Sequence, residues 1–367
     1  MSIPAAPVTP QKSTTPLAQI IANKHEKVIY GYDEATGLKV IVAVHNTALG
    51  PALGGMRIWN YTSEEEALVD VLRLSQGMTY KSAVAGLDLG GGKAVLIGDA
   101  SKLKTEAYLR RYGRFVEALN GTYITAPDVN ATMHDMVHIA KETPYVVGLP
   151  SLHGGSGDAS LATAYGTYMG LKAAAQNAYG SDSLQGKKIG VEGVGKVGSS
   201  LVSYLCKENA EVYITDIDPI KLAAIAQQYK VQPVQPAVFY DLAMDIYAPC
   251  ALGATLNDQT IPRLQCQVIA GAANNQLADE TRHSRMLLEK GIIYAPDFLI
   301  NAGGVINVHT EFYGGYNQAL AYQQVEHIYE VCLAILNQSA QAHKPPQEIA
   351  MRLAEQRIHA ISNARPV

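Results

Sequence analysis

Apolar positions along the chain follow two alternating periods, one typical of buried strands and one typical of amphipathic helices. Three short apolar runs predict strands: residues 38–45, 93–97 and 122–126. Two segments with apolar residues at three- and four-residue spacing predict helices: residues 63–74 and 105–119. Ser63 followed by Glu66 predicts a capping box at the start of the first of these helices.

The same alternation continues through the second half of the sequence. Predicted strands lie near Ile189, Val212, Ile246, Val268 and Ile292, with helices between them. A long helix of small residues, 159–178, precedes them and is expected to bridge two domains. The chain closes with two more predicted helices, residues 318–338 and 346–362. This order of elements predicts an α/β fold whose second half is a Rossmann unit.

The length of 367 residues exceeds one ordinary domain and fits two. We expect an N-terminal α/β domain over residues 17–147 and a C-terminal Rossmann dinucleotide-binding domain over residues 148–341. The last helix, within residues 342–367, is expected to return to the first domain. Residues 1–16, rich in Pro, Ser, Thr and Ala, predict a disordered tail.

Composition and charge argue against several classes of protein. The net charge of −4 gives no electrostatic case for nucleic-acid binding, and no apolar run reaches membrane-spanning length. The first residues lack the hydrophobic core of a signal peptide, so we expect a cytoplasmic protein. The four cysteines are scattered and the ten histidines do not cluster, which argues against disulfides and against a metal site.

A dinucleotide-binding fingerprint follows the predicted strand near Ile189. Gly193, Gly195 and Gly198 form a G-x-G-x-x-G that opens an apolar helix. Such glycines permit a tight turn and the close approach of a pyrophosphate to the helix N-terminus. Asp216 ends the next predicted strand, where an acid binds the adenosine ribose hydroxyls and repels a 2′-phosphate. Since no arginine follows Asp216, the sequence favours NAD over NADP.

Two lysines flank an apolar segment, Lys81 before residues 83–87 and Lys93 after the three glycines 90–92. Burying a lysine is costly unless an anion compensates it. One lysine can therefore hold a substrate carboxylate. The other, disfavoured as an ammonium by its neighbour and by desolvation, can act as a base. A glycine-rich turn with two exposed lysines is the competing interpretation, which the apolar surroundings disfavour.

Several motifs together resemble the glutamate, leucine, phenylalanine and valine dehydrogenase family, and within it most closely the leucine-specific members. They extend from about Tyr32 to the last helix: residues 50–55, 78–81, 90–93, 128–129, 163–166, 247–253, 270–277 and 301–305. The resemblance implies reversible oxidative deamination, in which an L-amino acid, NAD and water give a 2-oxo acid, ammonia and NADH. It also implies that the first domain binds substrate and forms a homo-oligomer, commonly an octamer or a dimer.

The resemblance assigns roles to individual residues. Lys81 would bind the substrate carboxylate, helped by backbone N–H groups near residues 54–55. Lys93, with a depressed pKa, would activate the water that attacks the imino carbon, and Asp128 would move the proton of the amino nitrogen. For Asp128, the N-cap of a helix over residues 131–140 is the competing interpretation.

The candidate residues occupy matching positions along the whole chain. The substrate-binding set is Gly54, Gly55, Met78 and Lys81, with an aliphatic cup formed by Leu53, Ala126, Val305 and Val308. The cofactor-binding set is Gly193, Val194, Gly195, Lys196, Val197, Gly198, Ser199, Asp216, Ala251, Thr163 and Asn275. Thr163 and Asn275 would hold the nicotinamide ring and its ribose.

Substrate choice depends on the aliphatic cup. Glutamate dehydrogenases carry a lysine at the position of Leu53, and burial of a second carboxylate against leucine would be costly. The cup therefore favours leucine, valine or isoleucine. One methylene is worth only ~1–3 kcal/mol in such a pocket, so overlap among aliphatic substrates is expected. Phenylalanine dehydrogenases tend to have glycine at the position of Ala126 and a larger residue at that of Val308.

Two alternative functions stay open at this point, and a few residues depart from the family pattern. A phenylalanine or other aromatic amino-acid dehydrogenase is the nearest alternative. A non-catalytic dinucleotide-binding regulator should have lost Lys93 or Asp128, and this chain keeps both. Among the departures, Met56 is expected to reshape the pocket floor and Pro127 to alter the direction of Asp128. Asp158 stands where the family commonly has asparagine.

Overall fold

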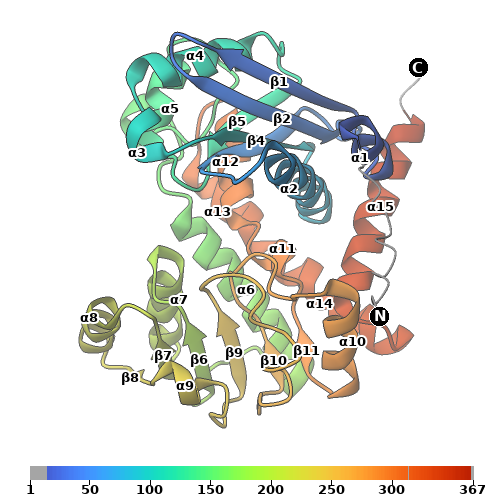
Figure 1. Ribbon diagram of the computed structural model, residues 1–367. Helices are drawn as coiled ribbons and strands as arrows, with labels where there is room; N and C mark the ends of the chain where they lie inside the picture. Colours follow the sequence, from blue (N-terminus) through green and yellow to red (C-terminus); the bar gives the residue numbers. More distant parts are fainter. Residues whose placement is uncertain (1–14, 313, 365–367) are drawn as a thin grey trace, which may run out of the picture.

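The computed structural model describes residues 15–312 and 314–364, in two lobes that each enclose a β-sheet (Figure 1). The first sheet has five strands in the order β1-β2-β4-β3-β5, and the second has six in the order β11-β10-β9-β6-β7-β8. Helices cover both sheets, so the predicted two-domain α/β fold is confirmed. The exact domain boundaries, 17–147 with 342–367 against 148–341, stay a prediction.

The first sheet is mixed. Its strands are β1 (Lys27–Asp33), β2 (Leu38–Asn46), β3 (Ala52–Trp59), β4 (Gly90–Ile97) and β5 (Tyr123–Pro127). β2 pairs antiparallel with β1 and β4, whereas β3 lies parallel to both β4 and β5. Alternate residues of β2 and β4 point to opposite faces, so the sheet buries apolar side chains on both.

Helices cover the two faces of this sheet. One face packs on α2 (Glu64–Val84), and the other packs on α4 (Glu106–Glu117) and α5 (Met133–Ala140). The short helices α1 (Pro16–Ala22) and α3 (Ala100–Leu103) complete the lobe. α2 matters most for function, because its C-terminal turn approaches the second lobe (Figure 1).

The second sheet is parallel throughout. Its strands are β6 (Lys188–Glu192), β7 (Glu211–Thr215), β8 (Gln232–Pro233), β9 (Ile246–Pro249), β10 (Val268–Ile269) and β11 (Ile293–Tyr294). β6 lies between β7 and β9, so the strand order reverses there. Ligands of open parallel sheets bind beyond the carboxyl ends of the strands at such a point.

Many helices surround the second sheet. They are α6 (Ser160–Tyr179), α7 (Lys196–Lys207), α8 (Pro219–Tyr229), α9 (Pro236–Phe239), α10 (Glu280–Glu289), α11 (Asp297–Ile300), α12 (Gly303–Phe312), α13 (Gln318–Glu326) and α14 (Ile328–Ala342), with a 3₁₀ turn at Ser151–His153. The buried α6 packs against α7, α12 and α14. Over residues 15–312 and 314–364, no helix combines the length and the apolar character needed to span a membrane.

The last helix, α15 (Pro346–Ala364), returns to the first lobe, as predicted. It packs against α2 as well as against α10 and α14 (Figure 1). Arg357 donates hydrogen bonds to the carbonyl oxygens of Ala83, Gly86 and Leu87, just where α2 ends. Carbonyl groups at a helix C-terminus lack the full set of partners that they have within the helix, and a cation is favoured there, so Arg357 stabilises the end of α2 that carries Lys81.

Some predicted element boundaries are wrong. The single helix predicted over residues 318–338 is two helices, α13 and α14, that meet at His327. Pro16, predicted as the end of a disordered tail, begins α1 with Thr15 as its N-cap. The rest of the predicted tail, residues 1–14, lies outside the described residues.

The predicted capping box of α2 is only half formed. Ser63 accepts a hydrogen bond from the backbone N–H of Glu66, as expected. The Glu66 carboxylate, however, accepts from the N–H and hydroxyl of Thr62 instead of from Ser63. The carboxylate therefore fixes the residue before the cap.

The three glycines before Lys93 lie in β4, so the interpretation of this segment as a turn is wrong. A Cβ at Gly91 would lie 2.1 Å from the hydroxyl oxygen of Thr79 on α2, and one at Gly92 would lie 2.7 Å from the ring of Tyr123 on β5. These glycines therefore let neighbouring elements approach β4 closely and carry Lys93 into the interior.

Candidate active site

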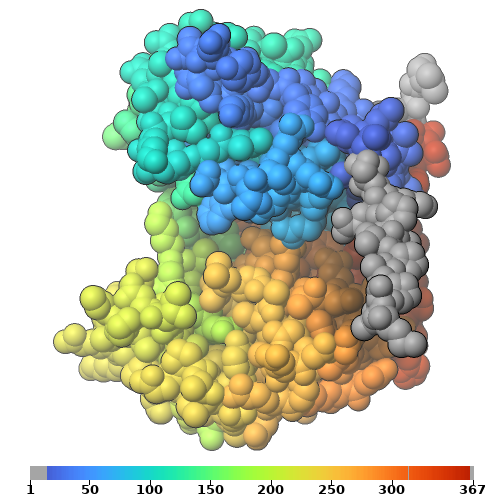
Figure 2. Space-filling model, in the orientation of Figure 1, coloured from blue at the N-terminus to red at the C-terminus, as the bar shows by residue number. Residues whose placement is uncertain are grey.

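A cavity of about 440 Å³ lies between the two lobes, and both lobes contribute to its walls. Figure 2 shows the hollow where the blue-to-cyan lobe faces the yellow-to-orange lobe. Most of the predicted site lines this cavity: Leu53, Gly55, Met78, Lys81, Lys93, Ala126, Asp128, Thr163, Val197, Asn275, Val305 and Val308. Gly54 is the one member of the predicted substrate set that does not line it.

Lys93 and Asp128 form an ion pair at one end of the cavity. Lys93 Nζ lies 2.7 Å from Asp128 Oδ2, and the lysine side chain is only 7% exposed. Arg57 on β3 reaches the same carboxylate oxygen with its Nε at 3.0 Å. Burial raises the pKa of Asp128, but Lys93 and Arg57 outweigh it and hold this pKa below its ordinary value. The carboxylate is therefore ionised beside two cations.

Asp128 is not a helix N-cap, so that competing interpretation is wrong. The next helix, α5, begins at Met133, and Thr132 caps it through a hydrogen bond from the N–H of Asp135. The unusual Pro127 packs against Gly148, where a Cβ would lie only 2.5 Å from the proline ring. With proline before it, Asp128 still reaches Lys93.

Lys81 lies in the last turn of α2 and lines the same cavity, and no carboxylate of the described residues forms an ion pair with it. Its Nζ donates to the neutral Oδ1 of Asn274 at 3.1 Å, across the gap between the lobes. Burial lowers the pKa of Lys81 to about 8; Asp297 opposes this shift and the neighbouring Lys93 adds to it. A half-buried ammonium without a contacting carboxylate favours the binding of an anion beside it.

Four aliphatic side chains form a wall beside these charged groups. Leu53, Ala126, Val305 and Val308 line the same cavity as the lysines and are each less than a tenth exposed. Leu53 and Ala126 come from β3 and β5, and the two valines come from successive turns of α12. This wall has no charged group of its own.

The alternation of β3 decides which of its residues face the cavity. Leu53, Gly55 and Arg57 line it, whereas Gly54 and Met56 point to the other face of the sheet. A Cβ on Gly54 would lie 1.7 Å from the Gly92 carbonyl oxygen, so this glycine is required for strand packing. Met56 is fully buried in the core beneath α4. The expectation that Met56 reshapes the pocket floor is therefore wrong.

The glycine fingerprint forms an open helix N-terminus at the carboxyl end of β6. Gly193 has a φ of 92°, and a Cβ there would lie 2.8 Å from Ala251. A Cβ at Gly198 would lie 1.9 Å from the carbonyl oxygen of Gly193, whereas the Cβ position of Gly195 is open. In the described structure α7 has no side-chain cap. These features fit a dinucleotide pyrophosphate, which would accept from the uncapped N–H groups.

Asp216 lies beside this turn. Its carboxylate accepts from the N–H of Val194 at 2.8 Å and from the N–H of Asp218 at 2.8 Å, which fixes it at the end of β7. Asp218 in turn caps α8 by accepting from two backbone N–H groups. Two carboxylates therefore lie next to each other beyond the carboxyl end of β7.

The remaining predicted cofactor residues lie around the carboxyl ends of the strands of the second sheet. Lys196 pairs with Asp158 at 2.9 Å, which links the start of α7 to the segment before α6. Ser199 donates its hydroxyl to the carbonyl of Lys196. Thr163 lies on the first turn of α6, and Asn275 has a left-handed backbone with a φ of 52°. Such a conformation in a non-glycine residue requires support from its surroundings.

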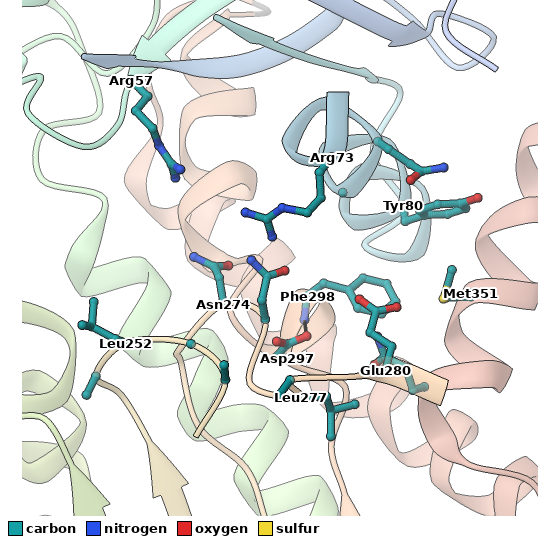
Figure 3. Close-up of a pocket in the computed structure, with 18 residues that line it drawn as sticks. Arg57, Arg73, Tyr80, Leu252, Asn274, Leu277, Glu280, Asp297, Phe298 and Met351 are labelled. Carbon is teal, nitrogen blue, oxygen red and sulfur yellow. Dashed lines mark hydrogen bonds between the residues drawn. The ribbon is translucent and has the colours of Figure 1, made fainter. Parts of the chain in front are cut away.

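A second cavity of about 760 Å³ continues from the first and shares Arg57, Asn274 and Asp297 with it. Figure 3 shows Arg57 and Arg73 extending from the first lobe towards Asn274 and Asp297 on the second. The sequence interpretation missed these charged and amide groups. If β3 had been predicted as a strand, its two-residue period would have placed Arg57 on the same face as Leu53 and Gly55.

Two family models match the chain. One, described as Glu/Leu/Phe/Val dehydrogenase, dimerisation domain, matches residues 25–145. The other, described as Glutamate/Leucine/Phenylalanine/Valine dehydrogenase, matches residues 218–365. The chain belongs to the glutamate/leucine/phenylalanine/valine dehydrogenase family. It is therefore an amino-acid dehydrogenase whose family uses a nicotinamide dinucleotide, and the interpretation as a non-catalytic regulator is set aside.

Named relatives of this family are similar over nearly the whole chain. The leucine dehydrogenase of Thermoactinomyces intermedius is 51% identical over 341 residues, which cover 93% of both proteins. The phenylalanine dehydrogenase of Caldalkalibacillus thermarum is 45% identical over 351 residues, 94% of both. The crystal structure of L-tryptophan dehydrogenase from Nostoc punctiforme has a TM-score of 0.83 at 44% identity, covering 95% of this chain and 99% of that one. The predicted resemblance to leucine dehydrogenases is thus confirmed.

Proposed function

We propose that this amino-acid dehydrogenase catalyses the reversible, NAD-dependent oxidative deamination of a branched-chain aliphatic L-amino acid: leucine, and also valine and isoleucine. The observation that carries the proposal is the aliphatic wall of Leu53, Ala126, Val305 and Val308 in the cavity that holds two lysines and an aspartate. An L-amino acid has a carboxylate, an amino group and a side chain on one carbon. The cavity offers one complementary region for each.

Lys81 is the proposed receptor of the substrate carboxylate. Its ammonium is half-buried and contacts a neutral amide, so an arriving carboxylate would add negative charge beside it. Carboxylate binding also favours the protonated form of Lys81 and offsets the effect of burial. The substrate therefore binds with its α-carbon between Lys81 and the pair formed by Lys93 and Asp128.

Lys93 and Asp128 are the proposed proton-transfer groups. Asp128 takes a proton from the α-amino group, and the bound dinucleotide supplies the acceptor for the hydride from the α-carbon. Lys93, neutral once it has released its own proton to solvent, then removes a proton from the water that attacks the imine carbon. Asp128 returns its proton to the nitrogen, and the carbon–nitrogen bond breaks as the carbinolamine hydroxyl loses its proton, which gives the 2-oxo acid and ammonia. Because Lys93 Nζ and Asp128 Oδ2 are 2.7 Å apart, protons can pass directly between them.

We assign NAD, not NADP, as the cofactor. The ribose hydroxyls of NAD can donate to Asp216, which two backbone N–H groups already orient. A 2′-phosphate carries about two negative charges, which Asp216 and Asp218 would repel. The next residue, Ile217, is exposed and offers no cation.

An aromatic amino acid is the second candidate substrate, because relatives at 44–45% identity are named phenylalanine and tryptophan dehydrogenases. An initial-rate survey decides between them. Reduced-cofactor formation from L-leucine, L-valine, L-isoleucine, L-phenylalanine, L-tryptophan and L-glutamate should be measured with NAD and with NADP. We expect the aliphatic substrates with NAD to have the highest kcat/KM. A higher value for an aromatic substrate would overturn the substrate assignment, and preference for NADP would overturn that of the cofactor.

We also propose that the protein is a homo-oligomer, a dimer or an octamer, formed through the first lobe. The family model that matches residues 25–145 is described as a dimerisation domain. β1, the first strand of this segment, lies at an edge of the first sheet. Light scattering of the native protein gives the number of subunits.

A further inference from the structure

Arg57 is a half-buried cation that the reaction outlined above does not use. It lies on β3, two residues after Gly55, with its side chain 21% exposed and directed into the cleft (Figure 3). Its guanidinium bridges two carboxylates: Nε lies 3.0 Å from Asp128 Oδ2, and Nη1 lies 2.8 Å from Asp70 Oδ2. A planar guanidinium can hold two such partners in fixed directions, which a lysine ammonium cannot do as well.

The second partner of Arg57 is itself well held. Asp70 lies on α2, and its side chain is 16% exposed. It also accepts from the hydroxyl of Tyr61 at 2.7 Å and from Arg73 at 3.1 Å. The chain of contacts Tyr61–Asp70–Arg57–Asp128 therefore connects the body of α2 to the reacting carboxylate.

The two cations on Asp128 contact the same oxygen. Lys93 Nζ and Arg57 Nε both bind Oδ2, and no other described residue hydrogen-bonds to Oδ1. A carboxylate held at one oxygen from two directions has a fixed plane, and its second oxygen has a fixed direction. A Cβ on Gly55 would lie 2.7 Å from the Cβ of Asp128, so the glycine allows this arrangement.

We propose that Arg57, anchored by Asp70, is a positioning residue that orients the carboxylate of Asp128 for proton exchange with the substrate amino group. The inference rests on the proposed role of Asp128. It predicts that Oδ1 of Asp128 receives the proton, while Oδ2 stays bound to Arg57 and Lys93. Arg57 thus acts through Asp128 and does not itself exchange a proton.

The charges around Asp128 give the proposal a measurable signature. Asp128 faces Lys93 on β4 and Arg57 on β3, with Lys81 on α2 and the phenol of Tyr123 on β5 as its more distant neighbours. Loss of Arg57 removes one of the cations that lower the pKa of Asp128, so this pKa rises. Because the carboxylate must be ionised to accept a proton, the acidic limb of the activity profile should move to higher pH.

Arg57→Met and Arg57→Lys test the inference, with Arg111→Met as a matched control. Arg111 forms an Arg–Asp pair with Asp33 in the same lobe, at 2.9 Å, and does not line the cavity. For Arg57→Met we expect kcat/KM for L-leucine to fall about tenfold or more and the acidic limb to move up by about one pH unit. The KM of NAD and the Tm should stay close to those of the control.

Arg57→Lys keeps the positive charge but loses the planar guanidinium that binds two carboxylates at once. The acidic limb of its activity profile should therefore return towards that of the parent, while kcat stays low. Asp70→Asn should lower kcat less than Arg57→Met does. If Arg57→Met lowers the Tm but leaves the acidic limb of the activity profile unchanged, Arg57 only stabilises the fold, and the inference is overturned.

Asp128→Asn separates this inference from the proposed function. If Asp128→Asn keeps the parental kcat, the role of Asp128 is wrong and the inference falls with it. If Asp128→Asn loses turnover while Arg57→Met keeps the parental kcat and pH profile, only the positioning role of Arg57 is wrong.

Discussion

The cavity presents two lysines, the half-buried Lys81 and the buried Lys93, in opposite electrostatic surroundings. Lys93 touches a carboxylate at 2.7 Å, and that carboxylate also binds Arg57. Lys81 donates only to the neutral amide of Asn274, and burial lowers its pKa to about 8. The difference teaches that similar residues in one cavity can have separate tasks. The uncompensated lysine is suited to bind an anion, and the compensated lysine is suited to exchange protons with its partner.

The first way to break this comparison is to remove the compensated lysine. Lys93→Met should lower kcat by ~10²–10⁴-fold, the usual contribution of a general acid–base group, with little change in the KM of the amino acid. Steady-state kinetics with L-leucine and NAD measure both constants. Lys102→Met, which removes an exposed lysine of the same lobe, is the control. Turnover near the parental rate would show that Lys93 is not the base.

A third lysine in the cavity, the second without a paired carboxylate, would sharpen the comparison. Leu53→Lys places an ammonium in the aliphatic wall, where leucine offers no anion and L-glutamate offers its second carboxylate. The ratio of kcat/KM for leucine over glutamate should fall on the order of 10²-fold, because an unpaired buried charge costs several kcal/mol. The ratio is insensitive to a general loss of folded protein. If it stays parental, Leu53 does not face the substrate side chain.

The same electrostatic reasoning applies to a carboxylate, Asp216, which lies beside the glycine fingerprint at the proposed cofactor site. Asp216→Ser removes a charge that repels a 2′-phosphate and a strong acceptor for the ribose hydroxyls. The NAD-to-NADP ratio of kcat/KM should fall ~10–150-fold, since a hydrogen bond to a charged group is worth ~1.5–3 kcal/mol. Parallel assays with the two cofactors measure this ratio. An unchanged ratio in the variant would remove Asp216 from cofactor selection.

The second lobe was the easier to predict from sequence. Its strands are short apolar runs, and Gly193, Gly195 and Gly198 followed by Asp216 have a backbone meaning that does not depend on distant residues. The strands predicted near Ile189, Val212, Ile246, Val268 and Ile292 are all present in the structure. Only the two-residue β8 was missed.

The first lobe was harder, because its site depends on pairings between distant segments. β3 contains two glycines and an arginine, which weaken its apolar pattern, so its alternation was not recognised. As a result Gly54 and Met56 were placed towards the pocket, and Arg57 was missed. Lys81 and Lys93 were predicted as a pair, but which of them has a carboxylate partner depends on Asp128, which the fold brings to Lys93.

The most direct test of the two lysine roles is the binding of 4-methylpentanoate, which is leucine without its amino group, as a competitive inhibitor across pH. Its carboxylate stays ionised, so the inhibition constant reports the charge of its receptor. We predict a constant value below the pKa of Lys81, about 8, and then about tenfold weaker binding for each pH unit above it. Lys81→Arg should remove this rise up to pH ~10, because arginine stays charged. Lys93→Met should keep the rise but move it to higher pH, because Lys93 is one of the groups that lower the pKa of Lys81. A flat parental profile, or a rise that persists in Lys81→Arg and disappears in Lys93→Met, would contradict the assignment of the substrate carboxylate to Lys81.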